Sequence, residues 1–490
     1  HKMVTPMGPK PQFVAVSEVK IMPQQRSASG DTSLWPLGYA LLVAALGLIF
    51  GYDLGTIFIS VEHGTEFLIL AETKSDILLG TYILGFIFGV FVAGHVTYGS
   101  GRKITLVASV TVGDLAALAS LVAPNFSVLL TSELAIGFSF GLYFIAALLY
   151  ISEITLPSYR PLAFAALPTC ACAGALTSLF SLINVDYLPL IVFSSLFTLT
   201  IIGISLVLVK LPESPRYLAL SGSTDAALAV LFQLRHDMGM AARELAEINE
   251  CCRGETRGIE FFLQNTTYRR LLFFICLITF MCNIAGVTII PSLLLGSMSI
   301  VVITAGPEPS YILDNNIVVY CTYGACFVSL VIHAWLVHFI PRRTLVLSSF
   351  TVSLGCLIAA AIITLFQDGF IQRWLITGTV MLYLAGAIGS FVTYLGIACD
   401  LMPIRGREFG VAAIVLAHSF GILFGLQSCM PLLHNFGITG FFVICAATSA
   451  IILYLCRKYL PDPGKQSLEV TEMRIMSAPS LSRLNSLHLP

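Results

Sequence analysis

The sequence predicts an all-α membrane protein of twelve transmembrane helices, arranged as two halves of six. Three observations carry this prediction. Hydrophobic residues make up 57% of the chain and charged residues only 11%, whereas a soluble globular protein carries about 25% charged residues. Twelve apolar segments are long enough to cross the hydrocarbon core, which takes about 20 residues. Charged sequence elements of the first half also recur in the second half.

The twelve segments are bounded by Gly, Pro or charged residues, and each must satisfy its backbone amides inside its own helix. The segments of the first half are 35–60, 77–98, 104–123, 127–152, 161–184 and 188–210. Those of the second half are 271–298, 315–339, 344–366, 374–399, 408–433 and 436–456. The predicted domains are an N-terminal tail, a first six-helix bundle, a linker, a second six-helix bundle and a C-terminal tail, at 1–34, 35–210, 211–270, 271–457 and 458–490. The C-terminal tail is polar, and we expect it to be disordered.

Lys and Arg residues set the expected orientation in the membrane. With the N-terminus in the cytoplasm, only Lys74 and Arg373 face outward, and all other basic residues lie in the tails, the linker or the short inner loops. Both termini are therefore expected on the cytoplasmic side, in the plasma membrane. No cleavable signal peptide is recognised before the first span. The thirteen cysteines lie mainly within spans, so no disulfide framework is expected, and the pair Cys170 and Cys172 is assigned to packing rather than to a metal.

Three charged elements occur in both halves at a nearly constant displacement, as a duplication would leave them. The matched pairs are 101–103 with 341–343, 153–160 with 400–407, and 211–216 with 460–465. Each element places carboxylates or guanidinium groups at the cytoplasmic ends of spans, where they can pair across a half-exposed interface and form a gate of weak contacts. The predicted gate residues are Arg102, Glu153, Arg160, Glu213, Arg216, Arg342, Arg343, Asp400 and Arg407. The alternative is that they only anchor and cap helices.

These motifs resemble the sugar porter family of the major facilitator superfamily, which contains facilitative glucose transporters and proton-coupled sugar symporters. The resemblance covers about residues 40–465. It rests on the repeated elements above together with Gly51-Tyr52-Asp53-Leu54-Gly55, Pro212 to Arg216 and Pro461-Asp462. It implies the major facilitator fold of two six-helix bundles, with a central site near the bilayer midplane and alternating access around it. It also implies short amphipathic helices in the linker, and residues 221–262 have the composition for them.

The residues at the family's sugar-binding positions depart from the family pattern. Counting from the motifs, a Gln of the fifth span falls on Pro168, and a Trp of the tenth span falls on Leu395. Sugar hydroxyls need many amide donors and acceptors, because an unpaired buried polar group costs about 1–3 kcal/mol, and most of these amides are lost here. The remaining candidate substrate-binding residues are Asn283, Thr288, His418 and Cys282.

The gate departs from the family pattern as well. The family carries an acid four residues before the Arg of each Gly-Arg-Lys element. Tyr98 and His338 stand at these positions. The resemblance therefore does not predict whether the gate of this chain prefers its open or its closed state.

Three carboxyl side chains fall within spans of the first half, namely Asp53, Asp114 and Glu133. Charges inside a membrane are costly, so they usually face a cavity and have a function. The resemblance implies that the acid at Asp53 works with an Arg in the fourth span, but Glu133 occupies that Arg position. Because two nearby carboxylates cannot both ionise cheaply, we hypothesise that Asp53 and Glu133 form a proton-coupling or cation site. The alternative is that Asp53 bonds locally and Glu133 is a protonated acid at a helix interface; Asp114 is expected to face neighbouring helices.

The predicted function is transport of a small organic solute, of hexose type, with a proton as candidate coupling partner. Two alternatives stay open: an organic cation transporter of the same superfamily, because of the acidic first half, and a solute sensor that does not transport, because of the altered pocket. We find no motif for an enzyme, a cofactor, a metal or nucleic acid. The lipid bilayer is the expected surrounding, and the oligomeric state is not assigned. His95 and His333, also near or within spans, are assigned to packing.

Overall fold

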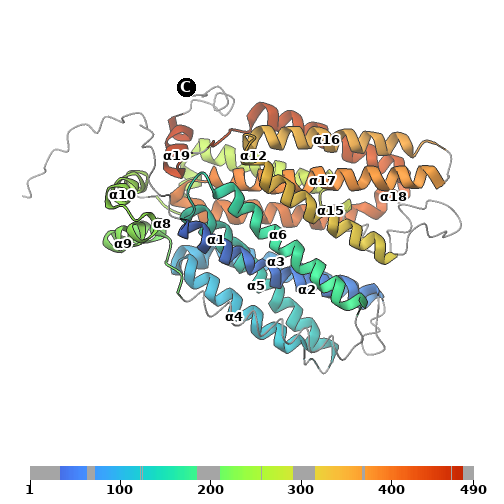
Figure 1. The fold of residues 1–490 in the computed structure, drawn as a ribbon, viewed down its shortest axis with the longest axis horizontal. Coiled ribbons are helices and arrows are strands. Elements are labelled where there is room, and N and C mark those ends of the chain that lie inside the picture. Colours follow the sequence, from blue (N-terminus) through green and yellow to red (C-terminus); the bar gives the residue numbers. More distant parts are fainter. Residues whose placement is uncertain are drawn as a thin grey trace, which may run out of the picture.

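The computed structural model describes residues 34–62, 72–121, 123, 125–184, 210–254, 256–290, 315–366, 370–464 and 466–477. Within these residues all regular structure is helical, and the long helices form two groups that lie side by side (Figure 1). The first group, in blue to teal, is α1 to α6, and the second, in yellow-green to red, is α12 to α18. Short helices of the linker and the C-terminal helix α19 lie together at one end, which we call the linker end.

The first half follows the predicted spans closely. Its helices are α1 (Trp35–Ala45), α2 (Gly47–Glu62), α3 (Glu72–Ser100), α4 (Arg102–Leu121), α5 (Phe126–Ile154) and α6 (Arg160–Asn184). A turn at Leu46 divides the first predicted span into α1 and α2. The side chain of Asn125 accepts a hydrogen bond from the N–H of Val128 at 2.9 Å and so caps the start of α5. The sixth predicted span, 188–210, lies almost wholly outside the described residues.

The second half contains the remaining long helices. They are α12 (Thr266–Ile284), α15 (Asn315–Leu336), α16 (Arg342–Ile363), α17 (Phe370–Asp400) and α18 (Arg407–Tyr459), which follows the short helix η1 (Ile404–Gly406). The last two predicted spans form two helices that α18 joins across a kink, where Gly437 takes a positive φ of 66°. The seventh predicted span is described only as far as residue 290, and α12 ends within it at Ile284.

Ten helices in the described residues are long and apolar enough to cross a membrane. A shorter apolar helix, Cys321–Leu336 within α15, corresponds to the eighth predicted span. Since the sixth span lies outside the described residues, these helices agree with the prediction of twelve.

The linker forms the amphipathic helices expected for residues 221–262. They are α8 (Pro215–Leu220), α9 (Thr224–Arg235), α10 (Met238–Cys252) and α11 (Ile259–Gln264). The expectation of a disordered C-terminal tail was wrong for residues 468–477, which form helix α19 (Leu468–Ser477). This helix buries Leu468 and Ile475 together with both of its glutamates. Tertiary contacts at the linker end therefore order a segment whose polar composition favours disorder.

Close packing of α2 against α6 fixes the part of the first half that carries Asp53. A side chain at Gly51 would place its Cβ 1.8 Å from the carbonyl oxygen of Ala171, and one at Gly174 would meet that of Leu48 at 2.0 Å. Only glycine permits backbones to approach so closely. Asp53 is therefore held on a rigid element.

Candidate functional site

Arg102 joins the two halves at the linker end. It begins α4 and is fully buried. Its guanidinium donates to the carboxylate of Glu153 at 2.8 and 2.9 Å and to that of Glu408 at 2.6 Å. Glu153 belongs to α5 in the first half, whereas Glu408 lies in the first turn of α18 in the second half. Sequence reasoning missed Glu408, although it directly follows the repeated Arg407.

A second ion-pair group repeats this arrangement around Asp400, at the end of α17. Arg342 of α16 donates to Asp400 Oδ2 at 2.7 Å, and the guanidinium of Arg160, from α6 in the first half, lies 3.7 Å from the same oxygen. Arg407 is also buried and donates to the carbonyl oxygen of Met402 at 2.8 and 3.2 Å. Two carboxylates of the second half are thus paired with guanidinium groups of the first.

The linker residues Glu213 and Arg216 extend the same network. Glu213 accepts hydrogen bonds from the backbone N–H groups of Arg102, at 3.1 Å, and Lys103, at 3.1 and 3.2 Å, where α4 begins. Burial raises the pKa of Glu213, and these N–H donors oppose that rise. Arg216 donates to the backbone carbonyl of Glu153 and, at 2.8 Å, to Glu469 of α19. The C-terminal helix therefore belongs to the network, which the sequence did not predict.

We call this set the gate network, and it closes the linker end in the structure. Its members are Arg102, Glu153, Arg160, Glu213, Arg216, Arg342, Asp400, Arg407, Glu408 and Glu469. All predicted gate residues except Arg343 take part; Arg343 instead donates to the carbonyl of Arg457 at 2.7 Å at the surface. The expectation of half-exposed, weak ion pairs was wrong, because both partners of the pairs made by Arg102 and by Asp400 are buried.

An aromatic contact lies beside the gate network. Phe409 of α18 packs against two rings of α3, with ring centroids 5.1 Å from His95 and 5.6 Å from Tyr98. Tyr98 is the residue that stands where the family carries an acid. The missing acid is thus replaced by a contact between aromatic rings across the two halves. His338, its counterpart in the second half, bonds only within its own turn, at 3.2 Å from the carbonyl of Ala334.

Three carboxyl groups of the first half form a second charged region, which we call the acid cluster: Asp53 on α2, Asp114 on α4 and Glu133 on α5. The carboxyl of Asp53 interacts electrostatically with those of Glu133 and Asp114. Ser120 donates to Glu133 Oε1 at 3.2 Å. Within the described residues, the buried Glu133 Oε2 and the buried hydroxyl of Tyr82 have no hydrogen-bond partner.

The spans that carry the acid cluster contain no Lys or Arg. No Lys or Arg occurs in 35–73, 75–101, 104–159 or 161–209. In the structure, Asp53 interacts electrostatically with Glu133 and also with Asp114, which we had expected to face neighbouring helices. The structure also adds Tyr82, whose hydroxyl interacts with Asp53 and Glu133 and which composition alone does not single out. The described residues hold no set of three His, Cys, Asp or Glu side chains arranged to bind a metal ion.

Three of the four candidate substrate-binding residues meet where α12 ends. The amide nitrogen of Asn283 lies 3.1 Å from His418 Nδ1, and Thr288 donates to Asn283 Oδ1 at 2.8 Å. The break in the helix depends on Gly286, which has a positive φ of 101°. Cys282 does not join this group; it is fully buried in the apolar core of the second half. A broken helix that presents polar groups is typical of binding sites inside membranes.

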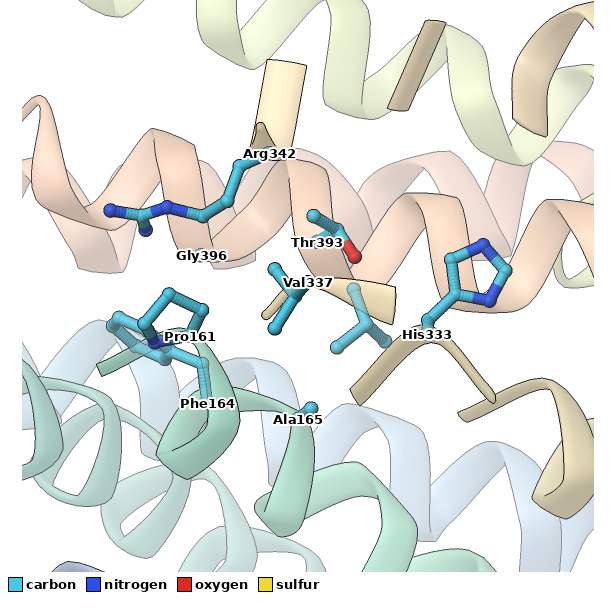
Figure 2. Close-up of a pocket in the computed structure, with 9 residues that line it drawn as sticks. Pro161, Phe164, Ala165, His333, Val337, Arg342, Thr393 and Gly396 are labelled. Carbon is cyan, nitrogen blue, oxygen red and sulfur yellow. The ribbon is translucent and has the colours of Figure 1, made fainter. Parts of the chain in front are cut away.

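A small recess lies between the two halves. Phe164 and Ala165 of α6 form one wall, and residues of α15, α16 and α17 form the other (Figure 2). Figure 2 shows Arg342 at one end of the recess and His333 at the other, with Thr393 between them. His333 lies 3.0 Å from the hydroxyl of Ser349 and 2.9 Å from the carbonyl of Ser329 through its two ring nitrogens, which agrees with its assignment to packing.

Comparisons with known proteins give one consistent result. The family model described as "Sugar (and other) transporter" matches residues 39–470. The arabinose-proton symporter of Escherichia coli (strain K12) is 24% identical over 477 residues, covering 93% of this chain and 96% of that protein. The galactose-proton symporter of the same strain is 23% identical over 482 residues, covering 95% of this chain and 100% of that protein. A structure of the proton:xylose symporter XylE, a protein of E. coli, bound to 6-bromo-6-deoxy-D-glucose, matches with a TM-score of 0.73 at 16% identity, covering 90% of this chain and 98% of XylE.

Proposed function

Because this chain belongs to the family of sugar (and other) transporters, we propose that it is a proton-coupled symporter of a monosaccharide. The family consists of membrane transporters rather than enzymes, and the relatives above are named for sugars and protons. The single observation that carries proton coupling in this chain is the acid cluster. It places three carboxyl groups, two of them buried, in a half whose spans contain no Lys or Arg.

The acid cluster suits a proton because of electrostatic repulsion. Two negative charges close together in a medium of low dielectric constant repel each other by several kcal/mol. A proton bound to one carboxyl removes that repulsion, and the group can take up or release the proton as its access to water changes. Asp53 and Glu133 are the proposed proton-coupling residues, and Asp114 and Tyr82 complete their surroundings.

The gate network supports alternating access. In the structure, the pairs of Arg102 with Glu408 and of Arg160 with Asp400 hold the linker ends of the two halves together. Opening that end requires both contacts to break. The contacts of Arg102 with Glu153 and of Arg342 with Asp400 each stay within one half, so Arg102 and Arg342 keep a carboxylate partner when the halves separate. This lowers the free-energy cost of opening, because a buried charge left alone costs about 3–5 kcal/mol.

The solute site is proposed at Asn283, Thr288 and His418 in the second half, where the broken helix α12 meets α18. The positive-inside pattern supports a cytoplasmic linker and cytoplasmic termini, in the plasma membrane. The two six-helix bundles, the linker and the tails, with the predicted boundaries, are the proposed domains.

The test is uptake of radiolabelled arabinose, galactose and xylose by purified protein in liposomes, with and without an inward proton gradient. Wild type is compared with Asp53→Asn and with Asp225→Asn, a matched control on the exposed surface of α9. We expect gradient-driven accumulation in wild type and the control, and only equilibration in Asp53→Asn. Saturable uptake that does not depend on the gradient would contradict proton coupling and indicate a facilitative carrier.

The open alternatives are outcomes of the same experiment. Uptake of an organic cation such as tetraethylammonium, with no sugar flux, would favour the cation transporter. Solute binding to the purified protein without flux of any solute would favour the sensor.

A further inference from the structure

The side-chain amide of Asn283 is buried and hydrogen-bonded within the protein through both its nitrogen and its oxygen. Its Nδ2 lies 3.0 Å from the carbonyl oxygen of Thr279, 3.2 Å from the carbonyl oxygen of His418 and 3.1 Å from His418 Nδ1. Its Oδ1 accepts from Thr288 at 2.8 Å. Because carbonyl oxygens only accept hydrogen bonds, the atom beside them must be the amide nitrogen, which fixes the orientation of the amide. Asn283 is also completely buried.

This orientation decides which nitrogen of His418 carries the proton. A hydrogen on Nδ1 would point at the amide nitrogen of Asn283 and its hydrogens, so Nδ1 is the nitrogen without a proton, and the ring proton sits on Nε2. The same clash disfavours the doubly protonated imidazolium. Around this contact, α12 and α17 present Asn283, Phe391 and Tyr394 within the described residues, and none of these is a charged group. The imidazole is thus held neutral by geometry.

The other edge of the ring is available for binding. Within the described residues, Nε2 of His418 has no hydrogen-bond partner, and the side chain is only half-buried. Phe391 stacks on the ring, with centroids 4.8 Å apart and planes inclined by 28°. The ring plane is therefore fixed from one face by Phe391 and at one edge by Asn283, with the N–H of Nε2 at the opposite edge.

We propose that His418 determines solute specificity as a fixed hydrogen-bond donor through its Nε2–H, and that Asn283 positions the ring without touching the solute. The inference deepens the proposed function and rests on it. An amide at position 418 could donate and accept, whereas this tautomer only donates at its available edge. The solute must therefore offer an oxygen as acceptor at this point, such as one hydroxyl or the ring oxygen of a monosaccharide.

The test compares analogues of the transported sugar as competitors of its labelled uptake. At each hydroxyl position, one analogue carries hydrogen and another carries fluorine, which accepts a weak hydrogen bond but donates none. For wild type we expect one position where the deoxy analogue binds about threefold to tenfold more weakly, the range of a neutral hydrogen bond, while the fluoro analogue binds nearly as well as the parent sugar. In His418→Phe, the deoxy and fluoro analogues at that hydroxyl position should bind equally well. At the other hydroxyl positions, their relative affinities should be the same as in wild type.

The variants are chosen so that folding is preserved. His418→Phe keeps the stack on Phe391, and the amide of Asn283 still donates to the carbonyl oxygens of residues 279 and 418. His418→Gln should restore the discrimination, because its amide nitrogen reaches the place of Nε2. Asn283→Ala should weaken the same discrimination without changing the other positions, which a general loss of folding would not do.

Two results would overturn the inference while leaving the proposed function intact. One is sugar transport by His418→Phe with discrimination unchanged at every position. The other is a wild-type protein that rejects the fluoro analogue as strongly as the deoxy analogue at each position, since the protein would then accept rather than donate. Absence of any sugar uptake by wild type would instead overturn the proposed function.

Discussion

The gate network and the acid cluster are both buried groups of charged side chains, and they differ in one respect. In the gate network, carboxylates face guanidinium groups at 2.6 to 3.7 Å. In the acid cluster, the carboxyl of Asp53 interacts electrostatically with the carboxyls of Glu133 and Asp114 and with the hydroxyl of Tyr82. Paired opposite charges hold a structure together when both partners remain, whereas carboxyls that interact with other carboxyls suit proton binding, because a bound proton removes their repulsion. The first region therefore carries the conformational state, and the second carries the proposed coupling.

Removal of Arg102 should have the largest effect. Arg102→Ala leaves the buried carboxylates of Glu153 and Glu408 without their shared partner, which costs about 3–5 kcal/mol. The measurement is thermal unfolding of the purified protein with a thiol-reactive dye, to which the many buried cysteines are suited. Arg343→Ala is the control, because its guanidinium donates only to a carbonyl at the surface and its loss should cost less than about 0.5 kcal/mol. Equal effects of both substitutions would contradict the comparison.

The glutamates of α19 give a second test within one helix. The carboxyl of Glu469 is buried, but the guanidinium of Arg216 and its hydrogen bond outweigh that and lower the pKa of Glu469. The carboxyl of Glu472 accepts from the N–H of Ile404 at 2.7 Å, yet burial raises the pKa of Glu472. Glu469→Gln should weaken the docking of α19 by about 2–3 kcal/mol, and Glu472→Gln should leave it unchanged or slightly stronger. Hydrogen exchange of the amides of 468–477 measures this docking.

The pH dependence of the same exchange has a definite sign. A carboxyl whose folded pKa is lowered stabilises the folded form above its unfolded pKa, about 4.3 for Glu, and loses that contribution as the pH falls. Docking of α19 should therefore weaken on acidification in wild type and change less in Glu469→Gln. A steeper pH dependence in the variant would show that Glu469 is not the group responsible.

Glu133→Gln should change stability in the opposite direction. It removes a buried carboxyl with an unpartnered oxygen and keeps an acceptor for Ser120, so the free energy of unfolding should rise by about 1 kcal/mol. Proton-driven sugar accumulation should be lost in the same variant. A destabilised variant would mean that Glu133 belongs with the structural charges of the gate network rather than with the acid cluster.

The aromatic contact beside the gate should give the smallest effect. Phe409→Leu keeps apolar volume but loses the ring contacts with His95 and Tyr98, which are worth about 0.5–1.5 kcal/mol. Because these contacts join the two halves, the closed linker end should become less populated. Faster hydrogen exchange of residues 95–100 is the expected readout, and Phe232→Leu, at an exposed site on α9, is the control.

The ion-pair partners of Arg102 and Arg216 are contacts that the sequence did not predict. Arg102 was identified from its repeated motif, but Glu408 lies 306 residues away. Arg216 was identified in the same way, and its partner Glu469 lies 253 residues away in a tail expected to be disordered. Asp114 was visible as a charge within a span, but only the tertiary structure showed that it interacts with Asp53. None of these contacts leaves a local sequence signal.

The sequence by itself determined the membrane class, the number of spans and the duplication, because span length, apolar composition and basic loops are local properties that the bilayer imposes on each segment. It also identified most members of the gate network. The tertiary structure decided which charges pair, that Asp114 interacts with Asp53, and which ring nitrogen of His418 faces Asn283. These depend on distances of a few Å between helices far apart in the chain, and electrostatic and hydrogen-bond energies vary steeply over such distances.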